Sequence, residues 1–283
     1  MPITDTDFNK KNLTFREQEL NELLKKIQKS ESTGNRGLAA AILAAGLGKR
    51  MKSPEKPKVM FEINSRPMID YVVELALGVN ADKIVPIVGH HREQVIEFLD
   101  NKYPEGNIEY ALQGEQLGTG HAVMQTESLL GDFEGDILIL SGDVPLLKLE
   151  TVQKLINEHK EKDNNATLLT TVFKNSAGYG RIVRDENGKF IRIVEDKDAS
   201  ENEKLIKEIN PAIYIVKRNI LYDALDRISP ENSQGEYYLT DIFHFISRER
   251  TGTVVTDDEL EVTGVNSIEQ LMEMETALNS RTG

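Results

Sequence analysis

A glycine-bearing segment near the start of the chain gathers positive charge on a protein whose formal net charge is −13. Residues 43–60 read LAAGLGKRMKSPEKPKVM. The segment contains two glycines and five cations, namely Gly46, Gly48, Lys49, Arg50, Lys52, Lys56 and Lys58. Glycine lets backbone N–H groups approach a phosphate closely, and Lys and Arg supply charge and donors. The segment therefore predicts an anion-binding loop with phosphate as the anion, and a solvated basic turn is the alternative.

The glycine spacing of this loop differs from two common phosphate-binding fingerprints. Gly46 and Gly48 are not followed by the third glycine of G-x-G-x-x-G, and the loop does not contain G-x-x-x-x-G-K-[ST]. Neither dinucleotide binding of the usual kind nor a Walker loop is therefore indicated.

A carboxylate follows a strongly apolar stretch in the middle of the chain. Residues 136–140 read DILIL, and Ser141, Gly142 and Asp143 come next, ahead of Pro145. An aspartate at the end of a buried strand is well placed to hold a divalent cation against a phosphate. A turn or helix-capping role ahead of the proline is an equally good explanation at this stage.

A third polar segment, QGEQLGTGH, covers residues 113–121. The amide of Gln113 and the backbone beside Gly118 and Thr119 could bind the edge of a nucleobase. The alternative is a flexible segment that leads into the following helix. His121 fits a structural role at the start of that helix better than a role as a base.

Several kinds of chemistry are excluded by what the sequence lacks. It has no cysteine, its five histidines show no metal-ligand spacing, and no nucleophile motif is present. The remaining inventory suits a reaction that depends on positioning and electrostatics, such as attack of one phosphate on the α-phosphorus of a nucleotide. The pI of about 5.0 argues against a general nucleic-acid binder. No secretory signal or membrane-spanning stretch is visible, so a cytoplasmic protein is expected.

The hydrophobic patterns alternate between strands and helices from residue 37 onward. The predicted strands of the first half cover residues 38–45, 83–90, 107–113 and 136–143. The predicted helices cover residues 67–80, 92–103, 118–130 and 151–162. This alternation indicates βαβ units and an α/β fold with a doubly wound, mostly parallel, Rossmann-like sheet. In such a sheet ligands bind at the carboxyl ends of the strands, where the three polar segments stand.

The second half of the chain predicts a small β-rich lobe and further helices. A strand over 166–173 precedes a hairpin that turns around the Asn-Gly pair at 187–188. A strand over 212–218 and a helix over 219–228 follow. Two more helices are expected, over 236–250 with its start near Thr240, and over 265–280.

The first 36 residues form a separate predicted unit. Apolar residues recur at near-helical spacing in this segment, at Phe15, Leu20, Leu23, Leu24 and Ile27. We expect an amphipathic helix and a linker over residues 1–36, followed by one α/β domain over 37–283. The helix is expected to pack on the domain surface, and a contact between two copies of the chain is the alternative.

At this point the motifs resemble, in order, those of bacterial N-acetylglucosamine-1-phosphate uridylyltransferases, which are sugar-phosphate nucleotidyltransferases. The similar segments are LAAGLGKRM with KPKVM, QGEQLGTGHAV, GDVPLL, GYGRIVRDENGKFIRIVEDKDA, EIN, NSQGEYYLTDIF and VTGVNS. They span about residues 38–270. The resemblance implies an Mg²⁺-dependent enzyme that joins UTP and N-acetylglucosamine 1-phosphate and releases pyrophosphate. The sugar phosphate is the nucleophile, and it needs no protein base because it is already ionised.

The resemblance also implies a role for each matching residue. Arg50, Lys58 and Asp143 would be the catalytic residues, with Asp143 and Asn266 holding Mg²⁺. The sugar would contact Gly180, Glu195 and Asn210. The nucleotide would contact Leu43, Ala44, Ala45, Gly46, Gln113, Gly118, Thr119, Ser141 and Gly142.

The chain departs from the family pattern in three places. Ser141 replaces an aromatic residue, and Pro211-Ala212 replaces a small Thr/Ser-Gly pair near the expected acetamido pocket. The hexapeptide repeats of the family's C-terminal left-handed β-helix are absent, so no acetyltransferase activity is expected. Pro211-Ala212 keeps open the alternative of a uridylyltransferase for another sugar 1-phosphate. A non-catalytic nucleotide-sugar-binding protein is a further alternative, against which the presence of Arg50, Lys58, Asp143 and Asn266 together counts.

Overall fold

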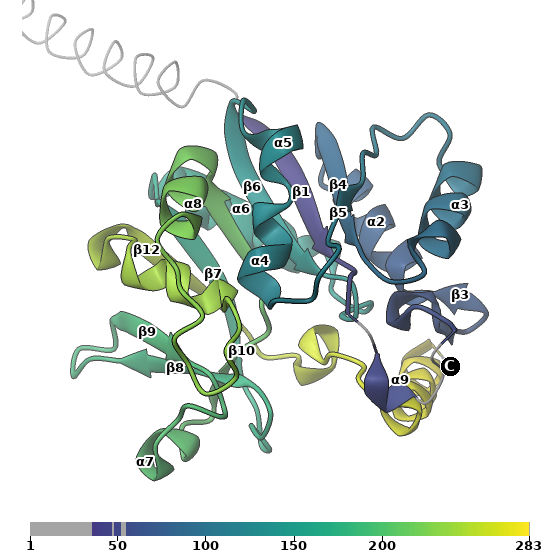
Figure 1. Ribbon diagram of the computed structural model, residues 1–283. Helices are drawn as coiled ribbons and strands as arrows, with labels where there is room; N and C mark the ends of the chain where they lie inside the picture. Colours follow the sequence, from purple (N-terminus) through teal and green to yellow (C-terminus); the bar gives the residue numbers. More distant parts are fainter. Residues whose placement is uncertain (1–35, 47, 52–54, 283) are drawn as a thin grey trace, which may run out of the picture. The chain divides into compact units, whose positions relative to one another are not determined.

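A computed structural model describes residues 36–46, 48–51 and 55–282 of the chain (Figure 1). The predicted N-terminal helix and its contact with a second copy lie outside the described residues, as does Lys52. Residues 37–283 group into one unit by their contacts. Among the described residues, no helix is long and apolar enough to cross a membrane.

A mixed sheet of ten strands forms the centre of the described domain (Figure 1). Its order is β5-β4-β1-β6-β11-β7-β10-β8-β9, and β12 pairs with β7. The strands are β1 (Gly37–Leu43), β4 (Lys83–Val88), β5 (Ala111–Leu112), β6 (Gly135–Ser141), β7 (Ala166–Val172), β8 (Gly180–Arg184), β9 (Phe190–Val194), β10 (Glu208–Asn210), β11 (Tyr214–Lys217) and β12 (Thr251–Thr256). Strands β5, β4, β1 and β6 are parallel, whereas β11 runs antiparallel to both β6 and β7. The predicted α/β fold is confirmed: four neighbouring parallel strands come from the first half of the chain, and β12 from the second half pairs in parallel with β7.

Helices cover both faces of the sheet. They are α2 (Met68–Gly78), α3 (Arg92–Lys102), α4 (Thr119–Met124), α5 (Glu127–Leu130), α6 (Leu149–Glu161), α7 (Glu201–Lys204), α8 (Arg218–Leu225) and α9 (Ile268–Thr282). Strand β1 shows why the sheet is doubly wound. Its residues Leu38, Ala40 and Ile42 pack in one cluster with α2, α3 and α6, and Ala39 and Ala41 pack in another with α4, α5 and α8. A strand buried on both faces must be apolar throughout, which explains the unbroken run in its sequence.

Pro86 lies inside β4, where proline removes a ladder hydrogen bond. Its neighbours Ile84 and Val88 accept backbone hydrogen bonds from Glu109 at 3.0 Å and Gln113 at 2.9 Å, on the side of β5. Pro86 points to that same side, between these two bonds. The missing donor therefore falls at an edge where pairing is already sparse, and the proline is tolerated.

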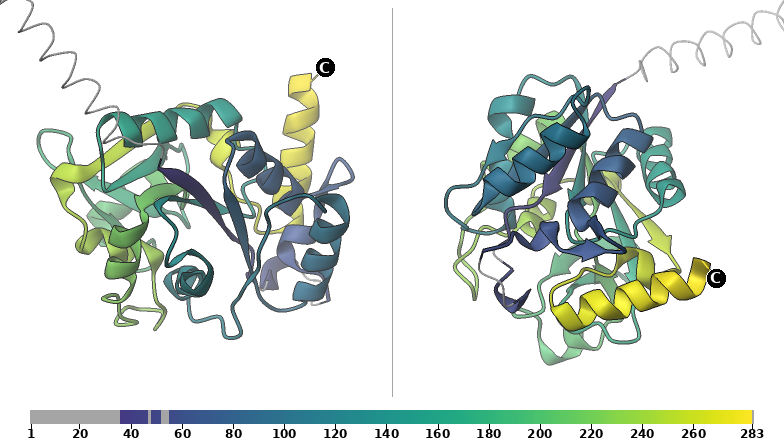
Figure 2. Two further views of the ribbon diagram at one scale, coloured as in Figure 1. Left: turned by 90° about the horizontal axis from the view of Figure 1, so that it is seen from above. Right: turned by 90° about the vertical axis from the view of Figure 1, so that its right-hand side faces the viewer.

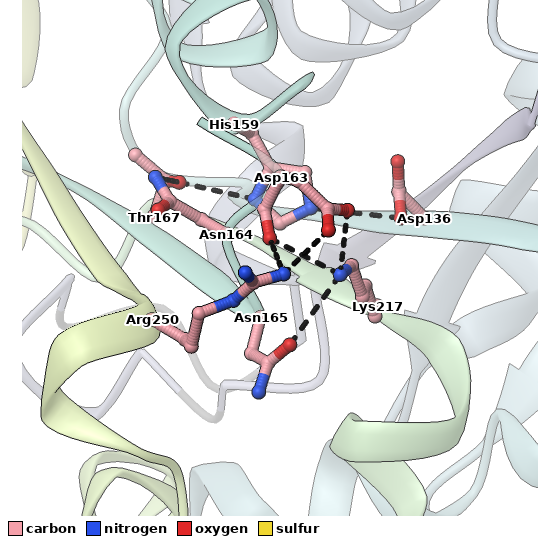
Figure 3. Close-up of polar contacts among 8 residues, drawn as sticks. All are labelled: Asp136, His159, Asp163, Asn164, Asn165, Thr167, Lys217 and Arg250. Atoms are coloured by element: carbon pink, nitrogen blue, oxygen red, sulfur yellow. Dashed lines mark hydrogen bonds and ion pairs between the residues drawn. The ribbon is translucent and has the colours of Figure 1, made fainter. Parts of the chain in front are cut away.

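A polar cluster ties the end of α6 to three strands (Figure 3). Asp163 accepts hydrogen bonds from Lys217 at 2.8 Å, at the end of β11, and from Arg250, just before β12. Asp163 has φ of 48°, a left-handed conformation suited to a helix end. Nearby, Nε2 of the buried His159 on α6 lies 3.5 Å from Oδ1 of Asp136 on β6. These contacts hold the middle of the sheet rather than the site described below.

The C-terminal helix α9 packs against a short hairpin of β2 (Glu62–Ile63) and β3 (Arg66–Pro67) (Figure 2). Met274 of α9 shares an apolar cluster with Ile63 and Met51, and Glu275 accepts the backbone N–H of Asn64 at 2.7 Å. The hairpin follows the glycine-bearing loop in the chain. Helix α9 therefore supports the segment that carries the predicted phosphate-binding cations.

Two predicted helices are wrong in extent. The single helix over 118–130 is broken into α4 and α5 beside Thr126, whose buried hydroxyl donates to the carbonyl of Val123. The helix over 236–250 is two 3-10 turns, Leu239–His244 and Arg248–Arg250. The backbone of Tyr237 donates to Leu117 and accepts from Gly120, both at 2.8 Å, so these residues cannot begin a helix.

Candidate active site

Two adjoining cavities open at the carboxyl ends of β1 and β6. The first, about 420 Å³, is lined by Leu43, Ala45, Gly46, Lys58, Val59, Gln113, Gln116, Gly118, Thr119, Ala122, Ser141, Asp143, Ala212 and Glu236. The second, about 260 Å³, is lined by residues that include Tyr179, Gly180, Glu195, Asn210, Pro211, Thr240 and Asn266. Both cavities are lined by Thr119, Ser141, Asp143, Ala212 and Glu236. Asp143 thus stands where two ligands could meet.

Four predicted catalytic and metal residues come together at this junction. The ammonium of Lys58 donates to Oδ2 of Asp143 and, at 2.7 Å, to Oδ1 of Asn266, which is 208 positions away in the chain. Arg50 donates to the same Oδ1 at 3.0 Å. The side chains of Lys58 and Asp143 are 12% and 24% exposed, so their charges are only partly screened by water. The anion-binding loop and the carboxylate after β6 therefore form one electrostatic unit.

Short local structures place these four residues. Lys58 begins a 3-10 helix (Lys58–Met60) directly after Pro57, whose φ of −54° suits that position. Asp143 follows β6, and its carbonyl accepts the backbone N–H of Val265 at 2.9 Å. This bond brings the segment before α9, and with it Asn266, to the end of the sheet.

The oxygen set at the junction fits a magnesium ion. Asp143 and Asn266 present a carboxylate and an amide oxygen to the same cation, the ammonium of Lys58. Mg²⁺ prefers oxygen ligands and is usually bound by one or two protein groups plus substrate phosphates. Within the described residues, no group of three or more His, Asp and Glu could hold a metal by itself. The site would therefore bind Mg²⁺ together with a phosphorylated ligand.

The predicted nucleotide-binding residues near the ends of β1 and β6 divide into two groups. Leu43, Ala45 and Gly46 line the first cavity. Ala44 is 5% exposed and packs in the core, and it does not line the cavity. Gly142 is not a lining residue either: its N–H donates to the carbonyl of Leu43 at 2.9 Å, and a Cβ there would lie 2.7 Å from that oxygen. Ala44 and Gly142 therefore support the ends of β1 and β6 and do not face the first cavity.

The predicted base-binding segment is held by contacts of its own. Gln113 donates from Nε2 to the carbonyl of Gly118 at 3.0 Å, and this Nε2 lies 3.2 Å from Nδ1 of His121. Gly118 has φ of +113°, and a Cβ there would lie 2.4 Å from the carbonyl oxygen of Tyr237, so only glycine fits. The hydroxyl of Thr119 accepts the N–H of Leu239 at 3.1 Å. Hydrogen bonds and close packing thus hold this segment in place as one side of the first cavity.

The three predicted sugar residues all line the second cavity. Glu195 accepts a hydrogen bond from Thr240 at 2.8 Å, and burial raises the pKa of its carboxyl. Asn210 donates to the hydroxyl of Tyr214 at 2.6 Å. A Cβ on Gly180 would lie 3.5 Å from Oε2 of Glu195. This cavity therefore offers acceptors and donors of the kind that bind sugar hydroxyl and amide groups.

Two of the departures from the family pattern contact each other. Ser141 donates from Oγ to the carbonyl of Ala212 at 3.3 Å, and Oδ1 of Asn210 accepts the N–H of Ala212 at 3.0 Å. Ala212 has φ of 60°, in the left-handed region that favours glycine. The N–H and the carbonyl of Ala212 are therefore both held by hydrogen bonds, in a backbone conformation that is sterically unfavourable for alanine.

Replacing Ala212 by glycine is expected to stabilise the protein by about 1 kcal/mol, because glycine adopts this φ without the steric penalty. In a domain of this size the midpoint of thermal unfolding should rise by roughly 2–4 °C. As a control, Ala277→Gly in α9 should lower stability by about 1 kcal/mol, because glycine is a poor helix former. An unchanged or lower midpoint for Ala212→Gly would show that the strain is absent.

Several lining residues were not predicted. Gln116 belongs to the predicted base-binding segment and Glu236 to the NSQGEYYLTDIF motif, but neither was predicted as a site residue. Tyr179 and Thr240 also line the second cavity. The amide of Gln116 repeats the type of Gln113 three positions on, which is a signal that could have found it. Nothing local distinguishes Tyr179, since its importance depends on a contact with a distant loop.

Known proteins resemble this chain in sequence and in fold. The sequence profile of the family "Nucleotidyl transferase" matches residues 39–262. "Bifunctional protein GlmU" of Thermoanaerobacter pseudethanolicus is 47% identical over 247 residues, which cover 87% of this chain and 52% of that protein. The protein of the same name from Fervidobacterium nodosum is 50% identical over 240 residues, which cover 85% of this chain and 50% of that protein. The chain thus spans about half the length of these curated relatives.

Solved structures share the fold at low sequence identity. A UDP-glucose pyrophosphorylase complexed with UDP-glucose aligns with a TM-score of 0.71 and 18% identity over 87% of this chain and 99% of that one. A putative glucose-1-phosphate thymidylyltransferase from Bacillus anthracis aligns with a TM-score of 0.70 and 19% identity, over 85% and 95% of the two chains. Because the sequence profile covers most of the chain and the curated relatives are about half identical to it, the chain belongs to the nucleotidyl transferase family.

Proposed function

We propose that the protein is a uridylyltransferase that joins UTP and N-acetylglucosamine 1-phosphate to give UDP-N-acetylglucosamine and pyrophosphate. One observation carries the proposal: Lys58 and Arg50 meet Asp143 and Asn266 where the two cavities adjoin. A nucleotide in the first cavity and a sugar phosphate in the second would bring their phosphates together at this point. The motif resemblance supplies the identities of the two substrates.

The proposed reaction is a single displacement at phosphorus. A phosphate oxygen of the sugar phosphate attacks the α-phosphorus of UTP, and the bond from that phosphorus to the pyrophosphate oxygen breaks. Lys58 and Arg50 neutralise the charge that grows on the departing pyrophosphate. The walls of the two cavities hold the attacking and leaving groups in line, which removes much of the entropic cost of their encounter. No side chain has to remove a proton, because the attacking oxygen is already ionised.

Mg²⁺ is the proposed cofactor, held by Asp143 Oδ2 and Asn266 Oδ1. When bound, it would act as a Lewis acid that offsets negative charge on the phosphates. The chain's own contribution is to keep the two oxygens pointing at one position, which the bonds from Lys58 show that they do. A cytoplasmic location is proposed together with these substrates.

A second candidate function keeps the chemistry and changes the sugar. The observation that favours it is the position of Ala212. Its backbone is held by Asn210, and the residue, which carries a methyl group, lines both cavities. An added methyl group or a lost backbone donor in a sugar pocket can change discrimination between sugars by about 10–200-fold. A different hexose 1-phosphate is therefore the alternative substrate.

Pyrophosphate release from UTP and Mg²⁺ should distinguish these candidates. With N-acetylglucosamine 1-phosphate we expect kcat/KM to exceed that for glucose, galactose or glucosamine 1-phosphate by about tenfold or more. Protein carrying Asp143→Asn serves as the blank for contaminating activities. Release with another sugar but not with N-acetylglucosamine 1-phosphate would sink the first proposal. Binding of both ligands without turnover would favour a non-catalytic nucleotide-sugar-binding protein.

A further inference from the structure

Tyr179 links the sugar-facing loop to the segment that carries Asn266. It lies between Gly178 and Gly180, at the start of β8, and lines the second cavity with both of them. Its hydroxyl accepts the backbone N–H of Gly264 at 3.2 Å, from a residue 85 positions away. The side chain therefore bridges two segments of the site that are distant in sequence.

The ring of Tyr179 is fixed by packing. It meets the ring of Phe173 edge-on, with centroids 5.0 Å apart and an interplanar angle of 77°. Burial raises the pKa of the phenol and outweighs the opposing effect of the hydrogen bond from Gly264, so the hydroxyl stays protonated at neutral pH. A phenol with a fixed ring and a fixed charge state is a rigid acceptor for Gly264.

The segment from Gly264 to Asn266 is held at each of its residues. Gly264 donates to Tyr179 at 3.2 Å, Val265 donates to the carbonyl of Asp143 at 2.9 Å, and the N–H of Asn266 donates to Gln270 at 2.7 Å. A Cβ on Gly264 would lie 3.6 Å from both Oδ2 of Asp143 and Nδ2 of Asn266. The backbone carbonyl of Gly264 accepts a hydrogen bond from Nδ2 of Asn266 at 3.5 Å, and the adjacent Val265 is bonded to Asp143, so the backbone that Tyr179 holds is linked to both proposed metal ligands.

We propose that Tyr179 is a positioning residue that orients Asn266 toward Asp143 and couples the sugar-facing loop to the metal position. This inference rests on the proposed function, because it takes Asp143 and Asn266 as the metal ligands. Residues behind metal ligands commonly change metal affinity or activity by about 10–100-fold when they are altered. Tyr179 would act in this way through a single hydrogen bond.

The test is Tyr179→Phe, which keeps the ring and its packing and removes the acceptor. In the presence of UTP, the dissociation constant for Mn²⁺, followed by electron paramagnetic resonance, is expected to rise about tenfold. Binding of UTP without metal should stay within about twofold, because Tyr179 does not line the first cavity. The Mg²⁺ concentration that gives half of the maximal turnover rate should rise by a factor similar to that of the dissociation constant for Mn²⁺.

A matched control separates this role from a loss of stability. Tyr222 is also a buried phenol, paired with Thr126 at 2.8 Å, and it lines neither cavity of the site. Tyr222→Phe should leave the Mn²⁺ constant unchanged. Mn²⁺ binding to Tyr179→Phe equal to that of the wild type would overturn the inference. The Mn²⁺ measurement needs no sugar and no turnover. Weakened Mn²⁺ binding would therefore support the role of Tyr179 even if the sugar assay refuted the proposed reaction.

Discussion

Lys58→Ala is expected to lower turnover by about two to four decades, since loss of one preorganised donor costs about two to three decades and loss of a charged group in phosphoryl transfer can cost more. The ammonium bonds to Asp143, where the two cavities adjoin, and Lys58 is the cation that lines the first cavity among the described residues. Its removal takes one positive charge from the developing pyrophosphate and leaves the carboxylate of Asp143 without its counter-charge. The binding of UTP should weaken less than turnover falls, because the charge is largest in the transition state.

The same variant has a second expected effect that does not depend on turnover. Lys58 and Mg²⁺ would use the same two oxygens, Asp143 Oδ2 and Asn266 Oδ1, so they compete for them. Lys58→Ala should therefore bind Mn²⁺ more tightly than the wild type when no nucleotide is present, by about tenfold if one nearby positive charge is removed.

Lys56→Ala is the matched control for Lys58→Ala. Lys56 comes from the same loop, but its ammonium pairs with Glu62 at 3.5 Å and lies over the ring of Phe61, 5.3 Å from its centroid. A surface pair of this kind contributes little, so turnover should stay within about threefold of the wild type. If Lys58→Ala also stayed within threefold, the role assigned to Lys58 would be wrong.

Asp143→Asn should lower turnover by about three decades and abolish the response to Mg²⁺, because an amide is a weaker magnesium ligand than a carboxylate and is neutral. The change preserves the shape of the side chain, so the N–H of Val265 can still bond to the backbone carbonyl of residue 143. The affinity for UTP without metal should stay equal or rise, since a negative charge next to the triphosphate is lost. Isothermal titration and pyrophosphate release measure the two effects separately.

Asp226→Asn supplies the control for the loss of one carboxylate. Asp226 follows α8 and is exposed, and it lines neither cavity of the site. Its replacement should leave turnover unchanged. Equal turnover of Asp143→Asn and the wild type would mean that Asp143 serves only the turn ahead of Pro145.

The two departures from the family pattern gain a common meaning from the fold. Ser141 and Ala212 are far apart in sequence, and each seemed a separate change in the pocket. The hydroxyl of Ser141 donates to the carbonyl of Ala212, whose peptide is also held by Asn210. A change of sugar preference would therefore involve both positions together, and single substitutions at either should not be additive.

Much of the fold could be predicted because burial leaves a periodic trace in the sequence. The apolar run of β1 reports a strand covered on both faces, and the Asn-Gly pair marks the hairpin of β8 and β9. The errors fall where distant partners override the local pattern. Tyr237 and Leu239 use backbone groups for hydrogen bonds to Leu117, Gly120 and Thr119, and the segment from Leu239 onward forms only 3-10 turns. The short strand β12 was missed although Thr and Val are common in strands.

By itself, the sequence of this protein determined the class of fold, the three polar segments at strand ends and the residue types suited to phosphate and magnesium. Only the tertiary structure decided which of those residues meet. The separation of Lys58 and Asn266 in the sequence does not determine their distance in space. That distance depends on strand order and on the packing of α9 against the β2–β3 hairpin. The same holds for Tyr179 and Gly264. A site of this kind is assembled from short segments, and the physical cause is that loops at the carboxyl edge of a parallel sheet converge whatever their separation in sequence.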